Sequence, residues 1–334
     1  MKLTKPAYFD TFRCIASLCP DSCCKEWDVQ VDEEIAALYR ALPGDLGDRL
    51  REVLSEENGE TVMTIIDGRC PMWRHDGLCR IQAELGEDAL CKTCREFPRL
   101  THDYGDFVEM GLELSCPEAA RIILSCPNPA TVTAEVPGGE EPEYDAETME
   151  TLLRTRETLR AILRDTTRPA NEVLALALMY GYQAQSELDG ADVAPFDPEA
   201  ALAEARSFAA DGSMDLILEF FAGLEILTPD WAARLLAPAP APWSADYLTI
   251  ARYFADRYWL QAVSDYDLVS RVKLMVVSCL VIRTLGGDLA ATAQAYSKEI
   301  ENSIDNVEAL LDGAYAHPAF TDDKLLGMLL GLQS

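Results

Sequence analysis

Cysteine spacing constrains this chain more than any other feature of its sequence. Nine of the eleven cysteines lie between Cys14 and Cys116, in the blocks CIASLCPDSCCKEW, CPMWRHDGLCRIQ, LCKTCREFPR and LSCPE. A concentration of thiols on this scale has three physical explanations: disulfides, a metal or iron–sulfur site, or buried apolar thiols.

Disulfides are the weakest of the three explanations. The N-terminus MKLTKPAYFDTF lacks the apolar core of a secretory signal, and the longest largely apolar run, residues 274–282, is too short for the roughly 20 residues of a membrane span. We therefore expect a cytoplasmic protein without a transmembrane segment, in which thiols stay reduced. The odd number of cysteines also argues against a fully paired framework.

Periodicity predicts an α+β chain that is mostly α. Short strands are expected at 27–31, 61–66 and 104–114, and short helices from Asp32, over 45–57, over 80–85, around 89–94 and after Cys116. Residues 70–79 read as a hairpin that turns at Asp76-Gly77 and brings its two end cysteines together. Beyond residue 145 the pattern is helical, at 148–163, 171–186, 214–227, 247–263, 268–285 and 289–304.

The breaker-rich, acidic segment TVTAEVPGGEEPEYD separates these two patterns. We therefore predict a cysteine-rich, metal-organised domain over 1–130, a linker over 131–145 and an α-helical domain over 146–334. The latter contains Cys279 in an apolar run, where a plain core thiol is expected, and Cys126 reads as a plain thiol before it.

A formal net charge of −29 excludes some partners. Such a surface repels nucleic-acid phosphates and anionic lipids, so no nucleic-acid partner is expected. The same charge attracts basic, lysine-bearing surfaces, although it also serves solubility alone.

The four cysteine blocks, taken in this order, resemble the flagellin lysine-N-methylase family, and more broadly bacterial cysteine-cluster proteins described as zinc- or iron-chelating. The resemblance covers roughly residues 5–125 and is looser over YLTIARYFADRYWLQAV and DLVSRVKLMVVSCLVIRTL. It implies transfer of methyl groups from S-adenosylmethionine to flagellin lysines and a [4Fe–4S] cluster. By motif position it implies the metal ligands Cys14, Cys19, Cys23, Cys24, Cys70, Cys79, Cys94 and Cys116, with Cys91 as an additional candidate.

Two departures from other methyl-donor enzymes limit what the motifs predict. Cys19 and Cys23 have the first spacing of the C-x3-C-x2-C motif of radical enzymes, but Glu26 stands where its third cysteine would be. A G-x-G-x-x-G fingerprint after a strand is also missing from the sequence, so the donor pocket is not placed by motif.

Residue types near the last two cysteine blocks give weaker candidates. Methyl transfer to lysine needs a group that accepts the amine proton, and Glu118, Glu113 and Tyr104 are the catalytic candidates. Arg95 and Arg99 are candidates for a cofactor carboxylate. Capping, surface and salt-bridge roles compete with each of these assignments.

Two alternatives stay open at the level of sequence. Cysteine spacing does not separate zinc from an iron–sulfur cluster, since thiolates bind both. A non-catalytic zinc- or iron-binding module would also account for the thiols, whose role would then be to hold the fold together.

Overall fold

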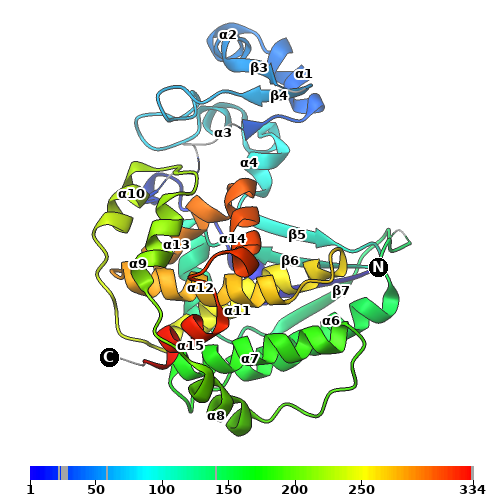
Figure 1. The fold of residues 1–334 in the computed structure, drawn as a ribbon. Coiled ribbons are helices and arrows are strands. Elements are labelled where there is room, and N and C mark those ends of the chain that lie inside the picture. The colour runs from blue at the N-terminus through cyan, green and yellow to red at the C-terminus, as the bar shows by residue number, and fades with distance from the viewer. Residues whose placement is uncertain (22, 24–28, 58, 140, 332–334) are drawn as a thin grey trace.

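The computed structural model describes residues 1–21, 23, 29–57, 59–139 and 141–331. Two hydrophobic clusters organise these residues. One runs from Phe9 and Phe12 through Leu112 to Leu329, and the other is confined to residues between Val29 and Cys91. In Figure 1 the second cluster belongs to the small lobe at the top, which we define as residues 29–96.

The small lobe combines a short sheet with short helices. Its three strands are ordered β2–β4–β3, all neighbours being antiparallel. Asp32 caps the first helix by accepting a hydrogen bond from the backbone N–H of Ile35 at 3.3 Å, as its sequence position predicts. The elements are β2 (Val29–Gln30), α1 (Glu33–Ala41), α2 (Gly44–Val53), β3 (Leu54–Glu57), β4 (Glu60–Met63), α3 (Arg80–Leu85), η3 (Glu87–Ala89) and α4 (Lys92–Glu96).

A four-stranded sheet brings the first residues of the chain beside residues 131–135. Its order is β5–β6–β1–β7, from β5 (Arg99–Asp103), β6 (Phe107–Leu112), β1 (Lys2–Pro6) and β7 (Thr131–Glu135). β1 runs parallel to β6 and antiparallel to β7, so that Thr4 lies opposite both Glu109 and Thr133. Two 3₁₀ turns, η1 (Phe9–Thr11) and η2 (Ala16–Leu18), follow β1, and α5 (Pro117–Ser125) follows β6.

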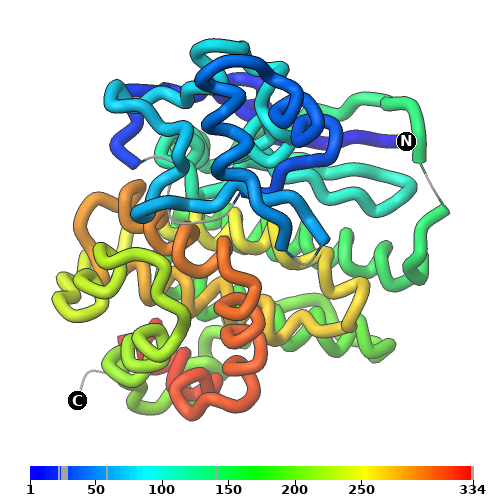
Figure 2. Tube along the Cα trace, turned by 90° about the horizontal axis from the view of Figure 1, so that it is seen from above, coloured from blue at the N-terminus to red at the C-terminus, as the bar shows by residue number. Residues whose placement is uncertain are grey.

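Helices form the rest of the chain, and in Figure 2 they gather on one side of the molecule with the blue and cyan N-terminal segments on the other. α12 lies at their centre, with sixteen of its seventeen residues buried. Ten α-helices and one 3₁₀ helix are described: α6 (Ala146–Leu163), α7 (Ala170–Leu188), α8 (Pro198–Phe208), α9 (Met214–Ala222), α10 (Pro229–Leu236), α11 (Asp246–Tyr258), η4 (Trp259–Val263), α12 (Val269–Leu285), α13 (Leu289–Ile300), α14 (Ile304–Ala316) and α15 (Asp322–Leu330).

The predicted fold class, mostly helical with short strands, is confirmed in these coarse terms. The predicted helix over 45–57 is wrong at its end, because residues 54–57 pair with β4 instead of continuing the helix. Part of the predicted strand at 27–31 falls outside the described residues. The division into domains at 130 and 145 stays a prediction, and residues 131–135 of the predicted linker form β7. Within the described chain, helices long and apolar enough for a membrane span are absent.

Candidate functional site

The first group of thiols lies where the N-terminal loop meets the start of α5. Cys116 occupies the N-cap position of this helix. Burial raises the pKa of its thiol to about 11, and nearby Cys19 and Cys14 raise that pKa further, whereas the backbone N–H groups of Ala119 and Glu118 oppose the rise. Cys14, Cys19 and Cys116 are therefore neighbours, although about a hundred residues separate the first two from the third.

α13 holds the loop that carries this group. Asp21 accepts hydrogen bonds from Gln294 at 2.8 Å and from Lys298 at 3.2 Å. Gln294 also donates to the backbone oxygen of Ser115, beside Cys116. The thiol of Cys19 in turn donates to the backbone oxygen of Asp21 at 2.7 Å. A helix from the C-terminal half thus sets the position of both cysteine segments.

The second group of thiols lies in the small lobe, around the buried ring of Tyr39. Burial raises the pKa of the Tyr39 hydroxyl most, and the nearby thiols of Cys91, Cys94 and Cys79 raise it further. Cys91 stands at the N-cap of α4, and its pKa is lowered chiefly by a hydrogen bond from the thiol of Cys94. These two cysteines therefore interact, as their spacing of three predicts.

Cys79 and Cys70 come from the predicted hairpin at residues 70–79. The Cys79 end of the predicted hairpin forms a bridge to Trp73, with Gly77 in the turn at φ 79°. Cys70 is buried in the lobe's core and its Sγ lies 3.6 Å from the sulfur of Met63.

These thiols were tested as a metal or cluster site. Among the described residues no group of three or more His, Cys, Asp or Glu side chains is placed to hold a metal ion. Cys23 is exposed, and Cys24 lies outside the described residues. The described thiols by themselves do not make a ligand set, so the eight-cysteine site stays a prediction and no chemical step is assigned to it.

The candidate acids and bases near Cys116 differ in environment. Glu118 pairs with Arg121 at 2.7 Å, and this hydrogen bond lowers its pKa. Tyr104 stacks on Phe107 with ring centroids 4.8 Å apart, and burial raises its pKa to about 12. Glu118 therefore stays ionised and Tyr104 stays protonated near neutral pH.

Glu113 belongs to a buried network that none of the sequence motifs suggested. Burial raises its pKa, while Arg257, with a guanidinium nitrogen 3.7 Å from its carboxylate, opposes the rise. Arg257 also contacts Glu301 at 3.1 Å and donates to the hydroxyl of Tyr253 at 2.8 Å. Tyr253 donates to Glu301 at 3.0 Å, and its hydroxyl accepts from the backbone N–H of Leu114.

The two arginine candidates lie apart from that network. The guanidinium of Arg99 lies over the ring of Phe12 at 5.3 Å, a cation–π contact at the start of β5. Arg95 is exposed in the last turn of α4. The pKa of Asp32 is lowered chiefly by a hydrogen bond from the backbone N–H of Lys92, and the charge of Arg95 adds a smaller part. Neither contact identifies a cofactor site, and both assignments stay predictions.

A cavity of about 280 Å³ lies between the four-stranded sheet and the helices α6 and α11. Sheet faces that pack on helices are normally apolar, but this face is mainly polar. Residues opposite one another share a face, and the paired positions lining the cavity include Thr4, His102, Glu109 and Thr133. Burial lowers the pKa of His102, and the charge of Arg257 adds to this, so the imidazole is neutral.

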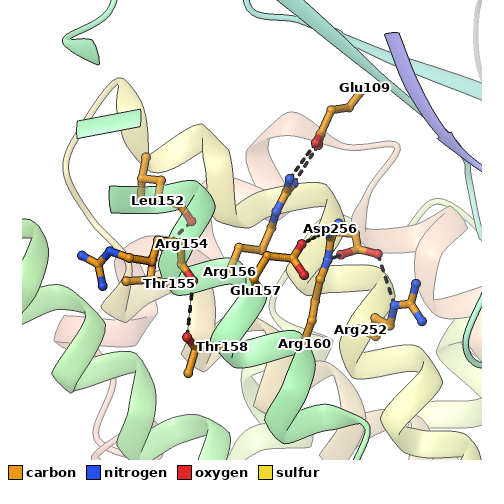
Figure 3. A network of polar contacts seen from close by, with 10 residues as sticks. All are labelled: Glu109, Leu152, Arg154, Thr155, Arg156, Glu157, Thr158, Arg160, Arg252 and Asp256. Atoms are coloured by element: carbon orange, nitrogen blue, oxygen red, sulfur yellow. Dashed lines mark hydrogen bonds and ion pairs between the residues drawn. The ribbon is translucent and has the colours of Figure 1, made fainter. Parts of the chain in front are cut away.

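One ion pair joins the sheet to a helix across the cavity, and a second joins the two helices. Figure 3 shows Glu109 reaching from β6 to Arg156 on α6, and the two form a bidentate pair with distances of 2.6 and 2.7 Å. Arg160, one turn further along α6, donates to Asp256 of α11 at 2.6 Å and pairs with Glu157. Arg156 is only 2% exposed, so this charge is held inside the protein.

Sequence reasoning missed this cavity. Arginines interleaved along 148–163 were the one available signal, and by themselves they are typical of a solvated helix face. Burial of Arg156 depends on the sheet that covers α6, which no local pattern reports.

Comparison with known proteins now adds to this geometry. The flagellar biosynthetic protein FliU of Salmonella muenchen is 34% identical over 137 residues, which cover 38% of this chain and 79% of FliU. The chain belongs to the FliU and lysine-N-methylase family. Proteins named lysine-N-methylase from Salmonella typhimurium and Salmonella choleraesuis are each 35% identical over 133 residues.

The match to the lysine-N-methylases spans only about a third of their length, 33% in each case. The matched residues make up 38% of the present chain. No family model and no solved structure matches the chain.

Proposed function

We propose that this family member is a lysine N-methyltransferase that transfers methyl groups from S-adenosylmethionine to lysine side chains of flagellin in the cytoplasm. The observation that carries the proposal is the match to proteins named lysine-N-methylase and to the flagellar protein FliU. The net charge of −29 supports it, because an acidic surface attracts a lysine-bearing substrate.

Cofactor binding is a second part of the proposal. We assign a [4Fe–4S] cluster, with zinc as the alternative, to Cys14, Cys19, Cys23, Cys24, Cys70, Cys79, Cys94 and Cys116, with Cys91 as an additional candidate. The two groups of thiols described above support the choice of ligand type, since soft thiolates suit both an iron–sulfur cluster and zinc. Such a centre supplies redox chemistry as a cluster, or structural cross-linking as zinc.

The chain's own residues support a role in handling the amine. A lysine must lose its proton before its nitrogen attacks a methyl group, and it must be shielded from water. Glu113 is buried with a raised pKa, and the guanidinium of Arg257, which lines the cavity, lies 3.7 Å from its carboxylate. A carboxylate with a raised pKa accepts a proton more readily near neutral pH than an exposed one does.

The test is methylation of flagellin by the full chain purified without oxygen. With S-adenosylmethionine we expect intact-mass and peptide spectra to show added methyl groups on flagellin lysines. Flagellin whose lysines have been fully acetylated by chemical means is the matched control and should gain nothing, because an amide nitrogen does not attack a methyl group. Iron, sulfide and zinc analysis of the same preparation, with its visible absorption, separates the two centres.

A lack of mass gain from protein with its metal intact would overturn the proposed activity. The chain would then be a non-catalytic metal-binding module, in which Cys→Ser changes act only by unfolding the protein. The mass of flagellin after incubation therefore separates the two functions on the same sample.

A further inference from the structure

The cavity beneath the sheet carries more positive charge than its surroundings. Its lining contains six basic residues and three acidic ones, although the whole chain has a net charge of −29. The basic residues are Lys2, Lys5, Arg156, Arg160, Arg252 and Arg257, and the acidic ones are Glu109, Glu157 and Asp256. A local excess of cations in an acidic protein favours an anionic group on the ligand.

Two buried polar atoms in the lining lack partners within the described part of the chain. They are Nε of Arg156 and Nε2 of His102. Most buried polar side-chain atoms in proteins have a hydrogen-bond partner, and one left without it costs about 1–3 kcal/mol. Arg156 already uses both terminal nitrogens on Glu109, so its third donor is available for a ligand.

Carboxylates and apolar walls complete the lining. Asp256 binds Arg160 through one oxygen and lies 3.5 Å from Arg252 through the other, which places positive and negative groups side by side. Leu100 and Leu153 supply apolar surface. The cavity thus offers sites for an anion, a cation and a short hydrocarbon or thioether stem.

We propose that this cavity binds the α-amino-acid end of the methyl donor, with the arginines of α6 and α11 on its carboxylate and the acids on its ammonium group. This inference rests on the proposed function. Ligand pockets usually measure about 300–1,000 Å³, and a cavity of about 280 Å³ suits one end of such a donor rather than the whole molecule.

Gly111 allows the cavity to be closed without touching its charges. It lines the cavity on β6, two residues after Glu109 and therefore on the same face. An added Cβ would meet no atom within 4 Å, so Gly111→Leu should project into the cavity without a clash at Cβ. Leucine also suits a strand better than glycine does, so the fold should be retained.

The test is calorimetric binding of S-adenosylhomocysteine to the full chain, which reports binding without turnover. We expect at least a tenfold loss of affinity in Gly111→Leu and in Arg156→Lys, which keeps the charge but loses the planar fork. Arg154→Lys is the matched control. Arg154 lies on the same helix but pairs with Glu187 and does not line the cavity, so its affinity should be unchanged.

Each outcome decides a different question. If the wild type does not bind the probe, the proposed function fails and this inference fails with it. If the wild type binds but folded Gly111→Leu and Arg156→Lys bind equally well, the site assignment is overturned and the proposed function stands. Loss in both cavity variants with full binding in Arg154→Lys supports the assignment, and circular dichroism of each variant reports its folding.

Discussion

Breaking the bidentate pair between Glu109 and Arg156 from one side should cost far more than breaking a surface ion pair. Its two side chains are 20% and 2% exposed, so neither ion is fully hydrated. Removing one partner of a buried pair leaves an uncompensated charge and costs about 3–5 kcal/mol. We expect Glu109→Leu to lower the free energy of unfolding by an amount in this range, because it leaves the fully buried guanidinium of Arg156 unpaired. The loss in Arg156→Met should lie at the lower end of the range, because the carboxylate of Glu109 keeps some contact with water.

The double variant should recover most of this loss. With both charges replaced by apolar side chains of similar size, no buried ion remains and the chain should lie within about 1 kcal/mol of the wild type. The double-mutant cycle therefore predicts strong coupling between the two positions. Urea unfolding followed by far-ultraviolet circular dichroism measures all four proteins.

An exposed pair on α2 provides the control. Arg49 and Glu52 are 35% and 68% exposed, and breaking this pair with Arg49→Met should cost no more than about 1 kcal/mol. If Glu109→Leu and Arg156→Met also cost under about 1 kcal/mol each, the pair is not shielded from water. The description of the cavity as a place that holds charge away from solvent would then be wrong.

Three further changes test other parts of the structure. Burial raises the pKa of Glu113, so the stability that its protonated form contributes is present below the ordinary carboxyl pKa of about 4 and is lost as pH rises through the folded pKa. Glu113→Gln should therefore gain stability relative to the wild type as pH rises above about 4, and a constant difference between urea midpoints would contradict the assignment. Gly327→Ala should lower the melting temperature sharply, because its Cβ would lie 1.7 Å from the backbone oxygen of Ala210. Gly111→Ala, which has open space at Cβ, should leave the melting temperature unchanged, and equal melting temperatures of the two variants would refute the close approach of α15 to Ala210. Asp21→Ala removes the hydrogen bonds from Gln294 and Lys298 that hold the N-terminal loop on α13, and it should lower the free energy of unfolding by about 1–3 kcal/mol. Proteolysis within that loop should become faster, and an unchanged cleavage pattern would show that other contacts hold the loop.

Local patterns predicted most of the longer helices and their first residues, but they missed the strands β1, β5 and β7. Asp32 caps α1 and Pro117 opens α5 as predicted, because caps and first-turn prolines act over a few residues. The segment at 54–57 was assigned to a helix and is a strand. Its pairing with β4 outweighed helical propensity, and the sequence of the segment alone does not report that pairing.

The candidate site divides in the same way. Blocks of closely spaced cysteines are visible in the sequence. Cys91 and Cys94 interact as their spacing suggests, but Cys91 is the N-cap of α4 and Cys94 its third residue, so the two do not lie on one helical face as predicted. Contact between Cys116 and the N-terminal loop is different, because Gln294 and Asp21 establish it across more than 250 residues.

By itself, then, the sequence determined the helical class, the family and the thiol-rich blocks, all of which depend on residue type and short spacing. Tertiary structure alone decided that β1 joins β6 in parallel and that Arg156 is enclosed beneath Glu109. Burial of a charge depends on which surface covers it. Glu109, which covers Arg156, lies 47 residues away in the chain, and no periodicity around Arg156 encodes that contact.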